Sequence, residues 1–132
     1  MSEQPKGDAF ESTQISRDTE RPAASRENLA QPVPLFLELV EGGPAGTRFP
    51  LSRTRTLVGR SGCDIDFPED KLLSRKHAAV EVYNTNYVLV RDLASTNGTF
   101  LNGFLVTQAR VAEGDVIAVG GVKLKLVAER GG

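Results

Sequence analysis

Apolar and polar residues alternate in short stretches along the chain from Leu35 onward. Residues 122–129, VKLKLVAE, show the pattern most clearly, because one valine and two leucines alternate with two lysines. A period of two residues is that of a β-strand with one buried face. Valine is frequent in these stretches, and no window repeats at the 3.6-residue spacing of an amphipathic helix. The pattern therefore predicts strands rather than helices.

Stretches rich in glycine, proline and asparagine separate the predicted strands. Segments 77–83 and 86–93 flank the turn Asn84-Thr85, an arrangement that predicts a β-hairpin. About ten short strands at this close spacing are typical of an all-β sandwich. The longer predicted strands lie in segments 35–40, 47–51, 54–59, 77–83, 86–93, 109–120 and 122–129.

The first 34 residues differ from the rest in composition. Their apolar residues are few and are scattered among Ser, Thr, Glu, Arg, Gln and Pro. Such a segment cannot bury enough apolar surface to offset the entropy lost on ordering it. We therefore expect a disordered tail over residues 1–34, a folded domain over 35–128 and a short C-terminal tail over 129–132.

The length of 132 residues suits one domain with a core, together with a tail. The net charge of −1 argues against nucleic-acid binding, as does the scarcity of aromatic residues that could stack on bases. The single cysteine, Cys63, forms no internal disulfide and suits a reducing compartment. No stretch is apolar for long enough to span a membrane, and the N-terminus is too polar for a secretory signal. We expect a cytoplasmic protein with no membrane or nucleic-acid partner.

Hydrogen-bond donors gather in three predicted loops, each at the end of a strand. The loops are Gly59-Arg60-Ser61, residues 73–77 and residues 95–98. Loops at one end of a sandwich can converge in space although they are far apart in the sequence. Together they offer guanidinium, hydroxyl, carboxamide and backbone N–H groups and no carboxylate. That set suits a phosphate group.

The stretch ASTNGTFLNG, residues 94–103, contains two Asn-Gly pairs. Asn-Gly is a strong signal for a tight turn because both residues tolerate a positive φ. We interpret Asn97-Gly98 as a rigid turn that presents polar groups to a ligand. We interpret Asn102-Gly103 as the hairpin turn that joins the next two strands. In isolation, either pair is most often only a turn, as is a Gly-Arg pair at a strand end.

Ser74 and His77 also permit an enzymatic interpretation, because a serine near a histidine is part of many esterase sites. Against it, the sequence has no G-x-S-x-G motif and no carboxylate obviously placed to orient the histidine. We expect His77 to be a hydrogen-bonded loop anchor and the protein to have no enzymatic activity.

The remaining reactive or charged residues near these loops have ordinary interpretations. We expect Cys63 to be a small, partly buried residue rather than a nucleophile. Four acidic residues lack the order of a calcium-binding loop, and we interpret them as a solvated acidic loop. They are Asp64, Asp66, Glu69 and Asp70. We therefore expect no cofactor and no metal site.

Three motifs, GRSGCDI, LSRKHAAV and STNGTFLNG, occur in an order and spacing that resemble the signature of the forkhead-associated (FHA) domain. The resemblance extends from about Leu35 to Val127, and three motifs in register are far more specific than one. It implies a β-sandwich of eleven strands that binds phosphothreonine-containing proteins through loops at one end. It also implies a signalling role downstream of a Ser/Thr protein kinase. An FHA fold that binds its partner independently of phosphate is the alternative.

The resemblance implies a role for each matching residue. Arg60 and Ser74 would contact the phosphate, Arg75 would join them, and Thr96 would add a hydroxyl group. Asn97 would hydrogen-bond the peptide backbone beside the phosphothreonine. The residues that match loop-shaping positions of the family are Gly59, His77, Gly98, Asn102 and Gly103.

Two threonines of the expected tail are candidates for phosphorylation, Thr13 in ESTQISRD and Thr19 in RDTERP. Small bacterial FHA regulators, which are similar in layout, couple an N-terminal phosphothreonine to their own domain. The resemblance thus implies that the phosphorylated tail closes onto the site and blocks other partners. Ser12-Thr13 stands where those regulators carry paired threonines, and a solvating tail with incidental threonines is the alternative.

Overall fold

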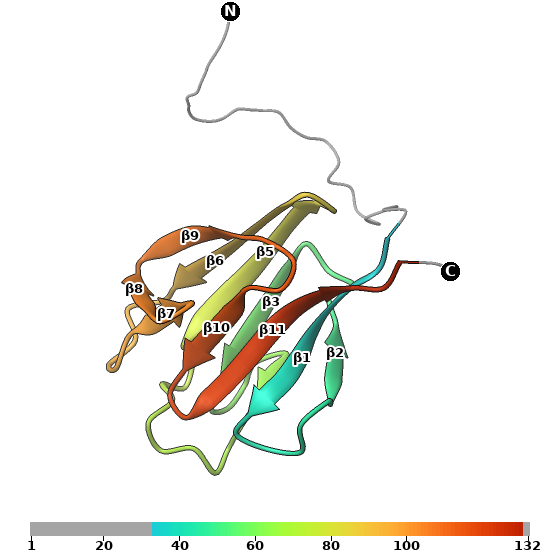
Figure 1. The fold of residues 1–132 in the computed structure, drawn as a ribbon. Coiled ribbons are helices and arrows are strands. Elements are labelled where there is room, and N and C mark those ends of the chain that lie inside the picture. The colour runs from blue at the N-terminus through green and yellow to red at the C-terminus, as the bar shows by residue number, and fades with distance from the viewer. Residues whose placement is uncertain (1–32, 131–132) are drawn as a thin grey trace, which may run out of the picture. The chain divides into compact units, whose positions relative to one another are not determined.

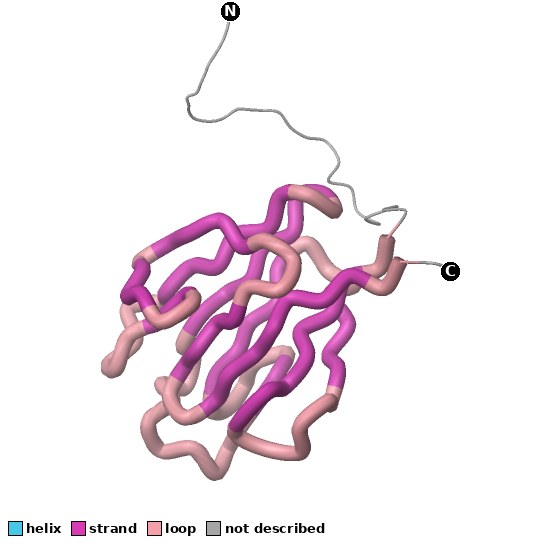
Figure 2. The backbone as a smooth tube through the Cα atoms, in the orientation of Figure 1, coloured by secondary structure: helices cyan, strands magenta, loops and turns pink. Residues whose placement is uncertain are grey.

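The computed structural model describes residues 33–130, and all structural statements concern this range. It contains eleven strands in two sheets and no helix (Figures 1 and 2). This confirms the all-β sandwich. The expected tail up to residue 32, with both candidate phosphorylation sites, lies outside the described residues. The strands are β1 (Leu35–Glu41), β2 (Arg48–Pro50), β3 (Arg55–Gly59), β4 (Ile65–Asp66), β5 (Ala78–Asn84), β6 (Tyr87–Asp92), β7 (Thr99–Leu101), β8 (Phe104–Val106), β9 (Gln108–Val111), β10 (Val116–Val119) and β11 (Val122–Ala128).

The six-stranded sheet has the order β2-β1-β11-β10-β7-β8, and all its pairs are antiparallel. The five-stranded sheet has the order β4-β3-β5-β6-β9, in which only β3 and β4 run parallel. Within residues 33–130 there is no helix that could cross a membrane.

Alternating residues of the facing strands form the core between the two sheets. In β11 the valine and leucines of the alternating pattern are buried, whereas Lys123 is exposed. The same period of two buries three leucines of β1. This burial of one strand face explains why these residues form strands. The remaining core is mainly valine from β3, β5, β6 and β10, with Ile65, Ile117 and Leu73.

The β5–β6 hairpin differs by one residue from its predicted position. Its turn is Thr85-Asn86, because Asn84 still belongs to β5 and pairs with Tyr87. The pairing register shifts between Val82 and Asn84, where one extra residue is accommodated. Asn84 Oδ1 accepts a hydrogen bond from the Asn86 N–H at 2.7 Å, which stabilises the turn.

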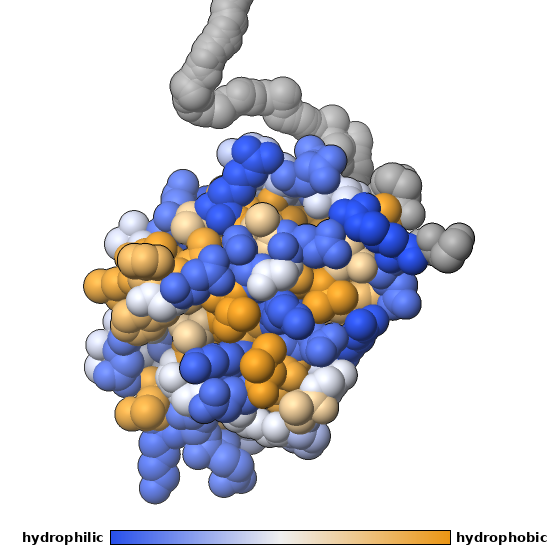
Figure 3. All heavy atoms as spheres, viewed as in Figure 1, coloured by the Kyte–Doolittle hydropathy of each residue, from blue (hydrophilic) through white to orange (hydrophobic). Residues whose placement is uncertain are grey.

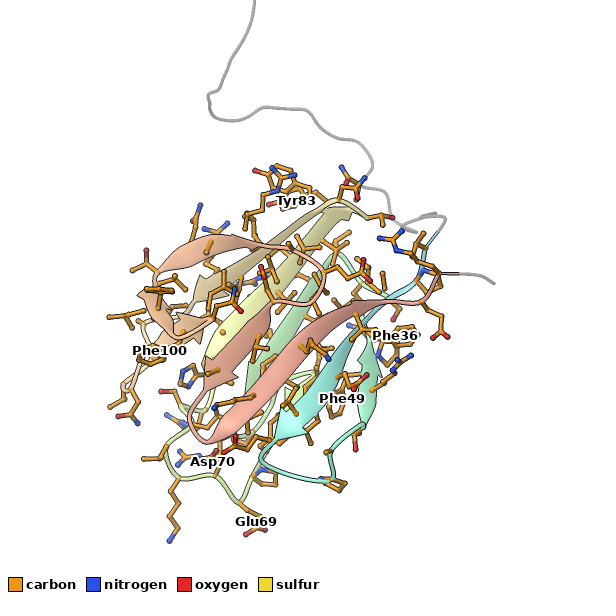
Figure 4. The ribbon with its side chains drawn as sticks, viewed as in Figure 1. Phe36, Phe49, Glu69, Asp70, Tyr83 and Phe100 are labelled. Carbon is orange, nitrogen blue, oxygen red and sulfur yellow. The ribbon has the colours of Figure 1, made fainter. Side chains whose placement is uncertain are left out.

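The two ends of the described chain lie side by side. The Glu129 N–H donates to the Pro34 carbonyl at 2.9 Å, which continues the pairing of β1 with β11 by one residue. At the opposite end of the sandwich, the β4–β5 loop lies near the β10–β11 turn (Figure 1). Figure 4 labels Asp70 at that end and Tyr83 at the far one.

Candidate functional site

Backbone hydrogen bonds join the loop after β3 to the loop before β5. The Arg60 N–H donates to the carbonyl oxygens of Ser74 at 3.0 Å and Arg75 at 3.1 Å. The Ser61 N–H donates to the same Arg75 carbonyl at 3.4 Å. The first two predicted loops are therefore held in direct contact, although 14 positions separate Arg60 from Ser74 (74 − 60).

This contact requires glycine at position 59. A Cβ on Gly59 would lie 2.0 Å from the Arg75 carbonyl oxygen and 2.8 Å from Cys63 Sγ. Cys63 Sγ lies 3.1 Å from the same carbonyl oxygen and donates its hydrogen to it. Burial, followed by the nearby charge of Asp66, raises the pKa of the Cys63 thiol, which keeps it protonated as a donor. The Arg75 carbonyl thus accepts two N–H groups and one S–H group.

Gly59→Ala is expected to destabilise the fold by about 3 kcal/mol, because the added methyl group collides with backbone that cannot move aside cheaply. Urea unfolding of the full chain measures the change. Gly46→Ala is the matched control, since Gly46 has a φ of +93° but no atom within 4 Å of a Cβ. It should lose only about 1 kcal/mol from backbone strain. Equal losses in the two variants would contradict the close approach at Gly59.

The third predicted loop, residues 95–98, makes hydrogen bonds to the second loop and to Leu72, which precedes it. The Thr96 N–H donates to Ser74 Oγ at 3.0 Å, and Asn97 Nδ2 donates to the Leu72 carbonyl at 2.8 Å. Ser74 Oγ accepts in this bond, so its own hydrogen remains available to a ligand. Asn97 keeps its second N–H and its Oδ1 for a ligand, while one N–H holds the loops together.

His77 lies beneath these loops and is fully buried. Its Nδ1 accepts the Ser74 N–H at 3.0 Å, and its Nε2 is 2.8 Å from the Gly98 carbonyl. A backbone N–H can only donate, so Nδ1 carries no hydrogen and Nε2 donates to the carbonyl. Both ring nitrogens are therefore occupied by backbone groups. This geometry argues against the esterase interpretation, because the ring is not positioned to accept a proton from Ser74 Oγ.

Asp92, at the end of β6, organises the third loop, and our sequence analysis missed it. Its carboxylate accepts the Ser95 hydroxyl at 2.5 Å, the Thr99 hydroxyl at 2.7 Å and the Ser95 N–H at 3.1 Å. Ser95 Oγ in turn accepts the Gly98 N–H at 3.0 Å. Burial acts to raise the pKa of Asp92, but the three hydrogen bonds outweigh it and hold the pKa below its ordinary value. The spacing of Asp, Ser and Thr in RDLASTNGT is the signal that could have identified this group.

Asp92 should contribute to the pH dependence of stability. Its folded-state pKa lies below the unfolded value of about 3.9, so its contribution is complete above that pH and is lost as the pH falls through the folded-state value. Asp92→Asn is expected to lose about 1.5–3 kcal/mol at pH 7 and to show a shallower stability decline below pH 4. Urea midpoints between pH 2.5 and 7 test this, with the exposed Glu69→Gln as control. Parallel curves for wild type and Asp92→Asn would contradict it.

Three of the four predicted acidic-loop residues have structural partners rather than full solvation. Asp64, Asp66 and Asp70 accept backbone N–H groups of Leu57, Cys63 and Leu72, respectively. Asp70 also accepts the Gly121 N–H at 2.7 Å and so ties the β4–β5 loop to the β10–β11 turn. Among residues 33–130, no group of three or more His, Cys, Asp and Glu residues could hold a metal ion.

Among residues 33–130, the arginines of the site lack the ion pairs that other arginines have. Arg48, Arg55 and Arg91 each lie within 3.5 Å of a glutamate carboxylate. Within the described part of the chain, no carboxylate pairs with the guanidinium of Arg60 or Arg75. With respect to residues 33–130, these two guanidiniums can therefore bind an anion without first breaking an ion pair.

The two Asn-Gly turns have different positions and geometries. Asn102 and Gly103 have φ values of +51° and +88°, as the two-residue hairpin turn between β7 and β8 requires. Asn102 also accepts the Val116 N–H at 2.9 Å, which places this turn against the start of β10, away from the three loops. In the first pair only Gly98 has a positive φ, +90°.

Comparison with known proteins agrees with this geometry. The family model of the FHA domain matches residues 56–120. The oxoglutarate dehydrogenase inhibitor of Corynebacterium glutamicum is 31% identical over 124 residues, which cover 93% of this chain and 85% of that protein. The chain belongs to the FHA domain family. The glycogen accumulation regulator GarA of Mycobacterium tuberculosis is 37% identical over 89 residues, 67% of this chain and 54% of GarA.

This FHA domain therefore spans about half the length of its mycobacterial relative. A solved structure from an analysis of phosphothreonine-dependent FHA domain interactions has a TM-score of 0.64 and 29% sequence identity. It covers 71% of this chain and 95% of its own. The sequence relatives show the family, and the solved structure shows the same fold. By name, the mycobacterial relative is a regulator and the Corynebacterium relative is an inhibitor.

Proposed function

We propose that this FHA domain binds phosphothreonine in extended peptide segments and is a binding module without catalytic activity. The observation that carries the proposal is the arrangement around Ser74. Its carbonyl accepts the Arg60 N–H and its Oγ accepts the Thr96 N–H, both at 3.0 Å, so all three loops meet at one residue. The family and the phosphothreonine-dependent interactions of a structural relative support the same ligand.

Each residue of the proposed site has a chemical reason for its role. A phosphate ester carries about −1.5 to −2 charges at pH 7, which the guanidiniums of Arg60 and Arg75 would balance. The free hydrogen of Ser74 Oγ and the exposed hydroxyl of Thr96 would donate to phosphate oxygens. The free part of the Asn97 carboxamide would bind the peptide backbone. Because Ser74, Thr96 and Asn97 are already held by internal hydrogen bonds, little of their entropy is lost on binding.

The biological context we propose is signalling by a Ser/Thr protein kinase, with phosphothreonine-containing proteins as partners. The chain's own tail, phosphorylated at Thr13 or Thr19, would be a competing ligand that closes the site. The alignment with the Corynebacterium inhibitor leaves 7% of this chain unmatched (100 − 93), fewer residues than the 34 of the tail, so the likeness extends into the tail. Mass spectrometry after co-expression with a Ser/Thr kinase tests the modification, and an unmodified tail would end this part of the proposal.

Calorimetric titration of the unphosphorylated full chain tests the proposed function. Peptides from a degenerate library are used in phosphothreonine, phosphoserine and unmodified forms. We expect micromolar binding of the phosphothreonine form, weaker binding of phosphoserine and none of the unmodified form. Equal binding of all three forms would instead favour an FHA fold that binds independently of phosphate. Hydrolysis of activated esters that disappears in Ser74→Ala would favour the enzymatic alternative.

A further inference from the structure

The outer face of the five-stranded sheet carries an exposed pair of tyrosines beside arginine side chains. Tyr83 is 52% exposed and Tyr87 is 38% exposed, and their rings meet edge to face with centroids 5.4 Å apart. Both lie at the β5–β6 hairpin, at the end of the sandwich far from the three loops, where Figure 4 labels Tyr83. Tyrosine and arginine are enriched among the residues that contribute most to binding in protein interfaces.

The strand register places these side chains on one surface. Four residues form a row across β3, β5, β6 and β9, each directly opposite the next. They are Arg55, Glu81, Leu89 and Arg110. Residues opposite each other share a face of the sheet, as do residues two positions along a strand. Direct contacts agree, since the Tyr83 hydroxyl donates to Glu81 at 3.3 Å and the Arg110 guanidinium lies over the Tyr87 ring. The surface that we call the tyrosine–arginine face consists of Arg55, Glu81, Tyr83, Tyr87, Arg91 and Arg110.

The tyrosine–arginine face is positively charged, although the whole chain has a net charge of −1. Its three arginines and one glutamate give a net charge of +2 (3 − 1). Glu81 pairs with both Arg55 at 3.5 Å and Arg91 at 2.9 Å. Among residues 33–130, no carboxylate pairs with the guanidinium of Arg110. Within that range, Arg110 is therefore the arginine of this face that can bind an outside carboxylate without first breaking an ion pair.

The Arg110 side chain is held in place although the residue is exposed. Its Nη2 donates to the Asn86 carbonyl at 2.8 Å, and its Cζ lies 4.4 Å from the centroid of the Tyr87 ring. A guanidinium has five N–H donors, so most of them remain available to a ligand. A carboxylate that binds this fixed guanidinium causes little further loss of side-chain entropy.

The outer face of the six-stranded sheet is less suited to an acidic ligand. Figure 3 views the molecule from this side, and hydrophobic and hydrophilic residues are interspersed on it. Arg48 lies 3.1 Å from the carboxylate of Glu38 and 2.9 Å from that of Glu129. Lys123 lies 3.5 Å from the carboxylate of Glu41. An outside carboxylate would have to compete with these glutamates.

We infer that the tyrosine–arginine face binds an acidic segment of a partner protein and that this binding needs no phosphate. A carboxylate of the segment pairs with Arg110, and an apolar side chain of the segment covers Tyr83 and Tyr87. Arg110 contacts Tyr87, and Tyr87 contacts Tyr83. Two residues at positions i and i+2 of an extended segment are about 7 Å apart and point to the same side, so they can reach both contacts.

Charge and ring geometry favour this occupant over two others. A second copy of the chain would meet the face through a two-fold axis, which places a charge of +2 against an equal charge. A single-stranded nucleic acid needs free aromatic ring faces on which its bases can stack. Arg110 covers one face of the Tyr87 ring, and Glu81 adds a carboxylate that repels phosphates.

This interaction lies apart from the proposed phosphothreonine site and does not rest on it. Strand β5 begins at Ala78, beside the buried His77, and Tyr83 follows five residue steps later (83 − 78). At about 3.3 Å per step the separation is roughly 17 Å. Both surfaces can therefore be occupied at once. A folded partner that carries a phosphothreonine and an acidic segment would gain avidity from the second contact.

The test is an NMR titration of the isotope-labelled full chain with the synthetic peptide ESLSESLSE. In its extended form, Glu and Leu alternate along one side. We expect millimolar binding, with shift changes centred on Tyr83, Tyr87 and Arg110, because one charge-assisted contact and one apolar contact support only weak affinity. The peptide ESSSESSSE lacks the apolar side chains and should bind about fivefold more weakly. The peptide KSLSKSLSK reverses the charge and should not bind.

Arg110→Gln is expected to weaken binding of ESLSESLSE about tenfold, because it removes both the charge and the forked donors. Lys123→Gln is the matched control, since it removes the same charge from an exposed position of the other sheet, and it should change binding less than twofold. Both residues are exposed, so both variants should fold. Arg110→Gln should bind phosphothreonine peptides like the wild type, and Arg60→Ala should bind ESLSESLSE like the wild type.

Equal weakening by Arg110→Gln and Lys123→Gln would overturn the inference, because only overall charge would then attract the peptide. Shift changes centred on Arg60 and Arg75 would overturn it by placing the acidic peptide in the proposed phosphothreonine site. The absence of shift changes at about 5 mM peptide would overturn it as well. Concentration-dependent shifts of the face without peptide would assign it to a second copy, and tighter binding of an oligouridylate would assign it to nucleic acid. Either result would overturn the inference.

Discussion

Replacing Arg60 by alanine is expected to weaken phosphothreonine-peptide binding on the order of 100-fold while leaving the fold intact. Two hydrogen bonds to a charged group, at about 1.5 kcal/mol each, account for a loss of this size. The fold should be unaffected because the loop contacts of Arg60 are made by its backbone N–H, and its guanidinium has no carboxylate partner in residues 33–130. Calorimetry measures the binding, and urea unfolding should stay within about 0.5 kcal/mol of the wild type.

Two further variants separate charge from geometry. Arg60→Lys keeps the positive charge but loses the planar fork, so its affinity should lie between those of wild type and Arg60→Ala. Arg53→Ala is the control. The Arg53 side chain is 75% exposed and its ion pair with Asp64 is long, at 3.8 Å, so this variant should bind like the wild type. Unchanged affinity in Arg60→Ala would contradict a phosphate site and support a binding mode that does not need phosphate.

Ser74 would be a less informative first target than Arg60. Its Oγ accepts the Thr96 N–H, so Ser74→Ala removes a ligand donor and also releases the third loop from the second. A loss of binding in that variant would mix the two effects. The same holds for Asn97, whose Nδ2 donates to the Leu72 carbonyl.

The strands were predictable because their signal is local. In β11 the alternation of apolar and charged residues over the first five positions coincides with alternating burial. The Asn102-Gly103 turn was predictable for the same reason, since the two residues themselves favour the φ values that the hairpin needs. The β5–β6 turn was misplaced by one residue because an irregular register before it is set by pairing across strands, which no single segment reveals.

The hydrogen bonds that hold the loops of the site together could not be predicted from local sequence. Asp70 reaches Gly121, 51 positions away, and Asn97 reaches Leu72, 25 positions away. In the sequence Asp70 is one of several acids in a polar loop, and nothing nearby marks it as a structural acceptor. The contact of Cys63 with the Arg75 carbonyl depends on how closely two loops approach at Gly59. Which loops meet can be expected from the family resemblance, whereas the atoms that hold them together require the structure.

Replacing His77 by alanine is expected to destabilise the protein by about 3–5 kcal/mol, the range for truncating a large buried side chain. Part of the loss comes from the cavity, and part from the Ser74 N–H and the Gly98 carbonyl, which would lose their partners at about 1–3 kcal/mol each. A domain stable by about 5–15 kcal/mol would come close to unfolding, and urea unfolding measures how close.

His77→Phe separates the two contributions, because it fills most of the space but makes neither hydrogen bond. If the imidazole mainly fills space, this variant should have the same stability in urea as the wild type and the same affinity for phosphothreonine peptides. We expect it instead to keep more stability than His77→Ala but to bind at least tenfold more weakly than wild type. The reason is that Nδ1 holds the loop that carries Ser74 and Nε2 holds the loop that carries Thr96, and phosphate binding needs both loops in register. Wild-type affinity in a stable His77→Phe would show that the Thr96–Ser74 and Asn97–Leu72 bonds are sufficient to align the loops.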